Sequence, residues 1–344
     1  MFAKKTLVAA AALLALVGAA QAQVKVYGAV DMSFGSFETA HAKGASTRVT
    51  AVQSGQMMTS FIGFSGSEDL GGGLKAEFAL ESFLNTDTGS NGLNMANGFW
   101  SRGSFVALTG GFGKVALGQY DNPLFTSGYT YNPFGSSMAF SPTMRHTYYN
   151  QGAVGQSVSG VGFDTGFVNS ITYETPNLSG FTAVAQFSPK ESTAAGAGNS
   201  YSVSGTYSAG PFGATLTYVK SGIATAYTAD EKVVGLGTSY DFGVLKAFGQ
   251  YTTVKQTSAT ANKDTIYQLG VSVPVSDKGA ILASFGKVQN KLTVGGAKES
   301  DTVFSLGYDY NLSKRTDVYA VFSNNQHTTK VSGQTFAFGV KHNF

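Results

Sequence analysis

The sequence predicts an all-β chain that forms a transmembrane antiparallel β-barrel of sixteen strands. Alternating apolar and polar residues recur in short runs separated by turn residues along most of the chain. The 344 residues include 44 Gly, 26 Phe and 17 Tyr but no Cys, and only 12% of them are charged. Soluble domains carry about 25% charged residues. Gly, Tyr, Phe, Thr and Ser also favour strands and turns over helices.

The first 22 residues are predicted to be a signal peptide. Lys4 and Lys5 precede an almost wholly apolar stretch at 6–18, and Ala20–Ala22 is an A-x-A cleavage site. An N-terminal membrane anchor is the alternative, but the apolar stretch is short for a span of about 20 residues. We therefore expect an exported chain whose residues 23–344 form one barrel domain.

The period-two runs predict where the strands lie. In the final run, for example, Phe336, Phe338 and Val340 share one face. The predicted strands are 24–35, 57–67, 73–84, 98–109, 112–120, 167–176, 180–189, 199–209, 212–221, 232–241, 244–256, 264–274, 279–290, 300–311, 316–326 and 334–344. Tight and long links alternate between them, which places both termini at the tight-turn rim, as in bacterial transmembrane barrels.

Closure follows from the physics of a membrane-embedded sheet. Every backbone N–H and C=O must be paired where no water is present, so such a sheet must close on itself. A soluble sandwich or propeller is the alternative, but it would need a second layer over the apolar rows and would leave a weakly charged surface. Barrels of sixteen strands enclose an aqueous channel.

The sequence offers no chemistry for an enzyme, a cofactor or a metal ion. His41, His146, His327 and His342 are scattered, none lies in a nucleophile motif, and no phosphate-binding loop follows the glycines. Without Lys4 and Lys5 the chain has 21 basic and 20 acidic residues, so we expect no nucleic-acid partner.

Several segments spread along the chain resemble the Gram-negative general porins, especially those of β-proteobacteria. Phe61–Lys75 is similar to their "RxGFKGSEDLGGGLKA" hairpin, and Gly339–Phe344 is similar to their "GxRHxF" terminus. Further likenesses lie in Val26–Asp31, Arg102–Leu108, Phe112–Gly118, Tyr173–Phe181 and Leu312–Thr316. In the hairpin, Gly66, Gly71, Gly72 and Gly73 are expected to supply positive φ angles, and Glu68 and Asp69 turn hydrogen bonds.

The resemblance implies an outer-membrane homotrimer, in contact with membrane lipid and lipopolysaccharide, that lets ions and small hydrophilic solutes diffuse passively. The third long loop, here 121–166, would fold inward and narrow the channel; an exposed surface loop is the alternative. Phe344 resembles the terminal aromatic residue used in outer-membrane assembly, and it also suits a lipid-facing girdle.

Strand parity, anchored by the family match, places several residues on the water side of the barrel. Phe61 and Ser65 stand where the family motif has Arg and Lys, whereas Arg102 matches a basic lumen residue. The other expected lumen residues are Lys75, Glu77, Glu81, Asp121 and Arg145. Gln119 replaces the Arg of an "LGRQ" motif, and its facing is left open.

The charges of loop and wall predict a weak preference for anions, because charge rings set ion selectivity through the local potential. The stretch between Asp121 and Asp164 contains no acidic residue, but it contains the basic residue Arg145. A solute-selective channel with an aromatic-lined constriction remains the alternative, as does an adhesin or purely structural barrel. The aromatic residues concerned are Phe125, Tyr129, Tyr131, Phe134, Phe140, Tyr148 and Tyr149.

Overall fold

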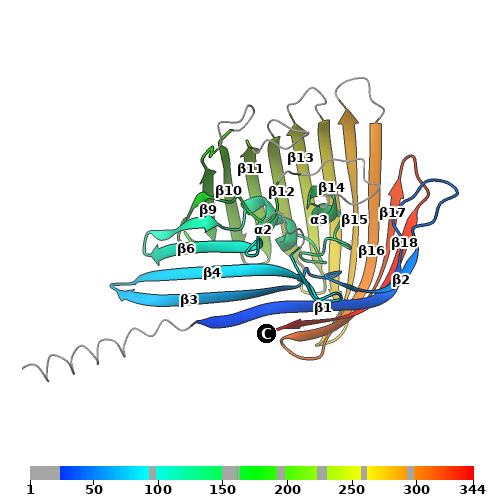
Figure 1. Ribbon diagram of the computed structural model, residues 1–344, viewed down its shortest axis with the longest axis horizontal. Coiled ribbons are helices and arrows are strands. Elements are labelled where there is room, and N and C mark those ends of the chain that lie inside the picture. The colour runs from blue at the N-terminus through cyan, green and yellow to red at the C-terminus, as the bar shows by residue number, and fades with distance from the viewer. Residues whose placement is uncertain are drawn as a thin grey trace, which may run out of the picture.

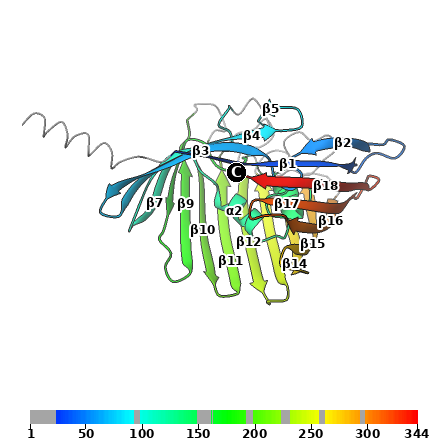
Figure 2. The ribbon, with the colours of Figure 1, turned by 90° about the horizontal axis from the view of Figure 1, so that it is seen from below.

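The computed structural model describes residues 24–92, 98–148, 161, 163–191, 198–222, 231–256, 262–292 and 298–344. The predicted signal peptide, 1–22, lies outside the described residues. Within these ranges the chain is almost entirely β-structure, with two short helices (Figures 1 and 2).

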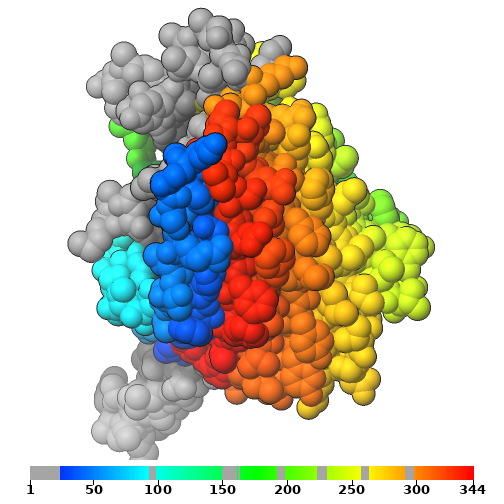
Figure 3. Space-filling view, turned by 90° about the vertical axis from the view of Figure 1, so that its right-hand side faces the viewer, coloured from blue at the N-terminus to red at the C-terminus, as the bar shows by residue number. Residues whose placement is uncertain are grey.

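The strands form one antiparallel sheet that closes on itself, as predicted. The first strand, β1 (Lys25–Phe37), pairs with the last, β18 (Gly333–Asn343). Figure 3 shows this seam, with the blue N-terminal strand beside the red C-terminal strand. Gly28 and Phe344 extend the seam by exchanging backbone hydrogen bonds of 3.2 and 3.1 Å.

The eighteen strands of the described residues occupy sixteen positions around the barrel, because two positions are each filled by two strands. β2 (Val49–Ser54) and β3 (Phe61–Gly71) both pair with β1, while β5 (Ser90–Asn91) and β6 (Gly103–Gly110) both pair with β4 (Leu74–Asn85). The remaining strands are β7 (Gly113–Gln119), β8 (Ser170–Glu174), β9 (Phe181–Ser188), β10 (Ser200–Ala209), β11 (Phe212–Ser221), β12 (Glu231–Asp241), β13 (Lys246–Gln256), β14 (Asn262–Pro274), β15 (Gly279–Leu292), β16 (Lys298–Asn311) and β17 (Thr316–His327).

The break between β2 and β3 was not predicted from the sequence, which placed 36–56 in a loop. Hydrogen bonds to Asp31 in β1 stabilise the irregular backbone between β2 and β3. Its Oδ2 accepts hydrogen bonds from the backbone N–H groups of Met57 (2.6 Å) and Met58 (2.9 Å). Its carbonyl oxygen accepts from Gly55, whose φ of 72° lies in the left-handed region. The chain therefore leaves the sheet after Ser54 and rejoins it at Phe61.

In the hairpin between β3 and β4, three of the four glycines that were expected to have positive φ angles do have them. Gly71, Gly72 and Gly73 have φ angles of 84°, 61° and 81°, and Asp69 Oδ1 accepts a 2.9 Å hydrogen bond from the Gly71 N–H. The prediction for Gly66 is wrong, because this residue is not among those with positive φ. A Cβ there would lie 2.4 Å from the ring of Phe78, so the cause is close packing.

The outward face of the barrel is apolar and much of the inward face is polar. In β14, Leu269 is 68% exposed, whereas Asp264 and Gln268 on the opposite face are fully buried. This inverts the pattern of a soluble protein, as expected where lipid covers the outside and the interior holds water. Other outward apolar residues are Val106, Leu108, Leu117, Val203, Leu216, Leu236, Phe304, Leu306, Phe336 and Phe338.

The described part of segment 121–166, which is 121–148, 161 and 163–166, contains two helices where no regular structure was expected. Asn122 begins α2 (Pro123–Thr130), because its Oδ1 accepts from the Leu124 N–H at 3.0 Å and a proline follows it. The second helix is α3 (Pro142–Tyr148). α2 packs against β10–β12 and α3 against β14–β16, on the concave side of the sheet (Figures 1 and 2).

Apolar side chains attach the two helices to the wall. Leu124, Phe125 and Met144 form one cluster with Val219, Val233 and Val254 of β11–β13. Phe134 and Phe140 form a second cluster with Leu282, Tyr319 and Val321 of β15 and β17. The barrel's buried core therefore lies between this segment and the inner face of the sheet.

Candidate functional site in the barrel lumen

Arg102 lies directly before β6 and forms the centre of a polar cluster on the inner wall. Its Nη1 is bound to Oε2 of Glu81 in β4, and its backbone N–H donates to the Glu81 carbonyl at 3.1 Å. The hydroxyl of Tyr27 in β1 donates to the other oxygen of Glu81 at 2.5 Å. The two carboxylate oxygens of Glu81 thus hold one cation and one neutral donor.

Phe61 packs directly on this cluster. The Arg102 Cζ lies 4.2 Å from the centroid of the Phe61 ring, a cation–π geometry. Tyr27 meets the same ring edge-on at 6.0 Å. Phe61 therefore faces the interior of the barrel, as predicted from strand parity. Only 7% of the residue is exposed, because its ring is covered by Arg102 and Tyr27 and is not in contact with bulk water.

A second ion pair lies closer to the tight-turn rim. The Oε2 of Glu77 accepts from Lys114 Nζ at 2.9 Å and from Thr109 Oγ1 at 3.0 Å. Glu77 therefore has its own cation and is not joined to Arg102. Lys75 lies two residues nearer the turn, opposite Thr109, and is exposed. Ser65 lies opposite Ala79 and is half-buried.

The two ends of segment 121–166 meet beside Arg102. The Asn122 N–H donates to the Thr165 carbonyl at 2.8 Å, and Thr165 Oγ1 donates to the Arg102 carbonyl at 2.7 Å. Gln119, whose facing the sequence left open, is buried here and donates from Nε2 to the Ser101 carbonyl at 2.7 Å. The inward segment thus leaves and rejoins the wall at one point.

This junction brings two carboxyl groups toward Arg102. Burial raises the pKa of Asp121 to about 6; the charge of Arg102 opposes this rise, whereas those of Glu81 and Asp164 add to it. Burial likewise raises the pKa of Asp164 to about 6, against the effect of Arg102. The charge of Arg102 therefore acts on three carboxyl groups: Glu81, which it contacts, and Asp121 and Asp164, whose pKa burial raises to about 6.

Polar contacts fix the segment at several points along the wall. Asn122 Nδ2 donates to Gln186 Oε1 at 2.9 Å and to Ser202 Oγ at 3.1 Å. Gln250 Nε2 donates to the carbonyls of Gly128 (3.0 Å) and Tyr131 (2.8 Å). The segment is thus anchored to β9, β10 and β13.

In the part of the barrel that the structure describes, the charged residues line two cavities of the lumen. Arg102 and Asp121 line one of about 520 Å³, together with Tyr27, Glu81 and residues of α2. Arg145 and Asp164 line another of about 600 Å³, together with residues of loop 38–47 and of β17. The structure therefore places Arg102 and Arg145 on different cavities, and Arg145 interacts electrostatically with Asp301 in β16.

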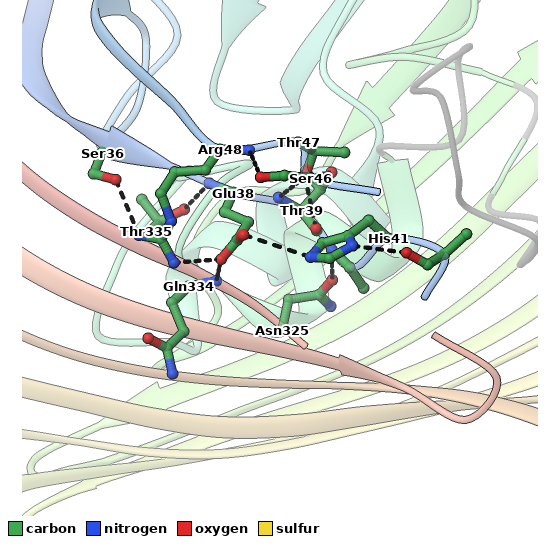
Figure 4. A network of polar contacts seen from close by, with 12 residues as sticks. Ser36, Glu38, Thr39, His41, Ser46, Thr47, Arg48, Asn325, Gln334 and Thr335 are labelled. Atoms are coloured by element: carbon green, nitrogen blue, oxygen red, sulfur yellow. Dashed lines mark hydrogen bonds and ion pairs between the residues drawn. The ribbon is translucent and has the colours of Figure 1, made fainter. Parts of the chain in front are cut away.

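A polar network closes the seam at the loop end of the barrel, where it borders the larger cavity (Figure 4). Glu38 accepts from Arg48 Nη2 at 2.5 Å and from the Gln334 N–H at 3.3 Å, and lies 3.5 Å from His41 Nε2. His41 and Val331 exchange backbone hydrogen bonds. The first and last loops are thereby joined.

Three residues of the polar clusters around Arg102 and Glu77 were not predicted from the sequence: Tyr27, Lys114 and Asp164. Tyr27 lies in the motif Val26–Asp31, and strand parity places it on the same face as Ala29 and Asp31. Its inward orientation could therefore have been predicted from the sequence. Lys114 is paired with Glu77 only through strand register. Asp164 lies within the electrostatic influence of Arg102 because the ends of segment 121–166 converge, and no local sequence signal predicts that convergence.

Phe344 contributes its backbone to barrel closure, and its side chain is 39% exposed at the tight-turn rim. No helix in the described ranges is long and apolar enough to cross a membrane. Among the described residues, no group of three or more acidic or histidine side chains could hold a metal ion.

A closed barrel that is apolar outside, and whose interior contains cavities lined by charged residues, is the structure of a transmembrane channel protein. The profile of the Gram-negative porin family matches residues 8–330. The chain belongs to this family, and it is an outer-membrane channel.

Individual relatives agree with this assignment. Outer membrane porin protein 32 of Delftia acidovorans is 36% identical over 288 residues, which cover 81% of this chain and 78% of the relative. The solved anion-selective porin from Comamonas acidovorans is 29% identical, with a TM-score of 0.76, over 94% of this chain and all of that chain. OmpT of Vibrio cholerae in its trimer form shares the fold, with a TM-score of 0.68 at 14% identity over 94% and 99% of the two chains.

Proposed function

We propose that this porin passes small hydrophilic solutes with a weak preference for anions. The observation that carries this proposal is the position of Arg102, whose guanidinium is held by Glu81 and Phe61 beside the smaller lumen cavity. Arg145 adds a second cation on the larger cavity. The likeness to a solved porin described as anion-selective supports the same direction.

The preference is weak because carboxyl groups surround the cation. Glu81 neutralises Arg102, and Asp121 and Asp164 add negative charge whenever they are ionised. The reversal potential of single channels in a salt gradient at neutral pH tests the proposal. A potential of the sign set by chloride is expected, whereas a clear potassium preference would contradict it.

Segment 121–166 is proposed to narrow the channel. Its support is the anchoring of α2 and α3 to the inner wall and the convergence of its ends at Arg102. Five of the seven aromatic residues that the sequence analysis names in this segment are buried against the wall or each other, which favours general diffusion over stacking of solutes. These are Phe125, Tyr131, Phe134, Phe140 and Tyr148. Conductance that saturates at low millimolar solute would instead favour a selective channel.

Residues 1–22 are proposed to be removed on export, and the mature chain to assemble as a homotrimer in the outer membrane. Phe344 is proposed to take part in that assembly through its exposed aromatic side chain. N-terminal sequencing of the purified protein should begin at Gln23. Cross-linking should give a species of three chains, and a band at monomer mass alone would refute the trimer.

A further inference from the structure

Glycines lie on the inner wall of the barrel at the places where the inward segment touches it. A Cβ on Gly237 of β12 would lie 2.4 Å from Cδ2 of Tyr131 and 2.8 Å from Oγ of Ser127. Carbon atoms in contact are about 3.5 Å apart or more, so a side chain at this wall position would collide with the segment. Tyr131 can therefore lie this close to the wall only because the residue beneath it is glycine.

Two prolines of the segment occupy similar positions on two further strands. A Cβ on Gly270 of β14 would lie 2.6 Å from Cδ of Pro133. A Cβ on Gly286 of β15 would lie 2.4 Å from Cβ of Pro142, the first residue of α3. We call the three wall positions, Gly237, Gly270 and Gly286, the glycine seat.

The backbone conformation does not require glycine at the three positions of the seat. The described glycines with positive φ angles do not include any of them. Each lies inside a strand, where glycine weakens the sheet and marks the close approach of another group. The group that approaches the wall here is the inward segment.

Two glutamines hold the segment at the height of the seat. In the strand register, Gln250 of β13 lies between Gly237 and Gln268 of β14. Gln268 in turn lies beside Gly286. The Gln250 side chain donates to the Tyr131 carbonyl at 2.8 Å, and Gln268 Oε1 accepts a 2.7 Å hydrogen bond from the backbone of α3. One row across β12–β15 thus combines glycines that receive side chains with glutamines that bind the backbone.

Gly237 is the position of the seat at which the segment alone excludes a side chain. The three atoms that a Cβ there would approach most closely all belong to Tyr131 and Ser127. At Gly286, by contrast, a Cβ would also lie 2.8 Å from the carbonyl oxygen of Tyr267 in the wall itself. A substitution at Gly237 therefore acts on the segment without straining the sheet.

The segment residues that cover Gly237 also line the channel. Tyr131 and Ser127 border the cavity of about 520 Å³ that Arg102 lines as well. To relieve an approach of 2.4 Å, Tyr131 would have to move by about 1 Å. Because β12 is paired with β11 and β13 along its length, we expect the segment to move and the wall to stay. That movement is directed away from the wall and into the cavity.

We propose that Gly237 sets the distance between the inward segment and the wall, and thereby the width of the channel beside Arg102. Gly270 and Gly286 seat the rest of the segment in the same way. Gly237 is buried beneath Tyr131, so it is a positioning residue that acts through this ring. This role rests on the proposed function, in which the segment narrows the channel.

The test compares Gly237→Ala with Gly249→Ala in the full mature protein. Gly249 lies in the neighbouring strand β13 on the opposite face from Gln250, and a Cβ there would make ordinary contacts of 3.5 Å with Thr238 and 3.8 Å with Leu269. Single-channel conductance is measured in planar bilayers, together with the exclusion of polyethylene glycols of graded size. Gly237→Ala should lower the conductance by about 25% and exclude smaller polymers, because the constriction narrows. Gly249→Ala should change neither property.

A double-mutant cycle separates positioning from a general disturbance of the fold. Tyr131→Ala removes the ring over Gly237 and should raise the conductance, because this ring lines the smaller cavity. In the Tyr131→Ala background, Gly237→Ala should have little or no effect, since the two residues act through one contact. Gly270→Ala, which meets Pro133, is a second wall variant that should also lower the conductance. The temperature at which the folded band is lost on electrophoresis shows that each barrel has formed.

An unaltered conductance in both Gly237→Ala and Gly270→Ala would overturn the proposal. So would an equal loss from Gly237→Ala with and without the Tyr131 ring, because the effect would then not pass through this contact. If Tyr131→Ala raises the conductance while Gly237→Ala leaves it unchanged, the segment narrows the channel but the glycine does not set its position. If Tyr131→Ala leaves the conductance unchanged, the narrowing itself is contradicted, and the role of Gly237 fails with it.

Discussion

The hydroxyl of Tyr319 in β17 donates a 2.7 Å hydrogen bond to Oδ1 of Asp31 in β1, reaching across β18. The other oxygen of Asp31 holds the backbone of Met57 and Met58 at the break between β2 and β3. One fully buried carboxylate thus connects the closing seam of the barrel to the irregular start of the next position.

Replacing Asp31 with Asn should destabilise the barrel by about 2 kcal/mol, because an amide nitrogen would face donors that now meet a carboxylate oxygen. Tyr319→Phe removes only one of the three side-chain contacts and should cost about 1 kcal/mol. The measurement is the temperature at which the folded band is lost on electrophoresis. Asp277→Asn, in an exposed turn, is the control, and an equal loss in that variant would contradict the account.

Replacing Arg102 with Gln should shift selectivity toward cations by about fivefold in the permeability ratio. The change leaves Glu81, Asp121 and Asp164 without their shared cation. Arg145→Glu should move selectivity in the same direction, through the larger cavity. Reversal potentials in a potassium chloride gradient measure both variants. Arg315→Gln at the tight-turn rim should behave as the unmodified protein, and an unaltered ratio in Arg102→Gln would show that this residue does not set the selectivity.

Anion preference should increase as the pH falls from 8 to 5. Burial raises the pKa of both Asp121 and Asp164 to about 6, so both carboxyl groups lose their negative charge within this interval. Arg102 stays charged throughout, and the charge at the junction therefore becomes more positive. The reversal potential is followed across the pH range.

The double variant Asp121→Asn/Asp164→Asn should prefer anions more strongly than the unmodified protein at pH 8 and show little further change on acidification. Asp164→Glu preserves an ionisable carboxyl group and should retain the pH response. The explanation fails if the double variant responds to pH as the unmodified protein does.

The strands were predictable because lipid outside and water inside impose an alternation that each strand carries locally. Leu269 and Gln268, neighbours in β14, already display it. The helices α2 and α3 were not predictable, because wall contacts such as Gln250 with Gly128 hold them. The break after Ser54 likewise depends on Asp31, which is distant in sequence.

The candidate site also has features that the sequence predicts and features that it does not. The inward facing of Glu81 and Arg102 follows from strand parity, and the structure joins the two residues in an ion pair. The approach of Asp164 to Arg102 depends on where a long segment rejoins the wall.

We propose that segment 121–166 lies within the conducting path and narrows it. Because the Asn122 N–H and the Thr165 carbonyl are 2.8 Å apart, a short Gly/Ser linker can replace residues 124–163 without moving the wall. The deletion would expose Val219, Val233 and Val254 to water, so polar residues replace these three valines in the same variant. Single-channel conductance in planar bilayers is then compared with that of the unmodified protein. A clearly larger conductance is expected for the shortened chain, and an equal or smaller conductance from a folded barrel would show that the segment does not narrow the channel.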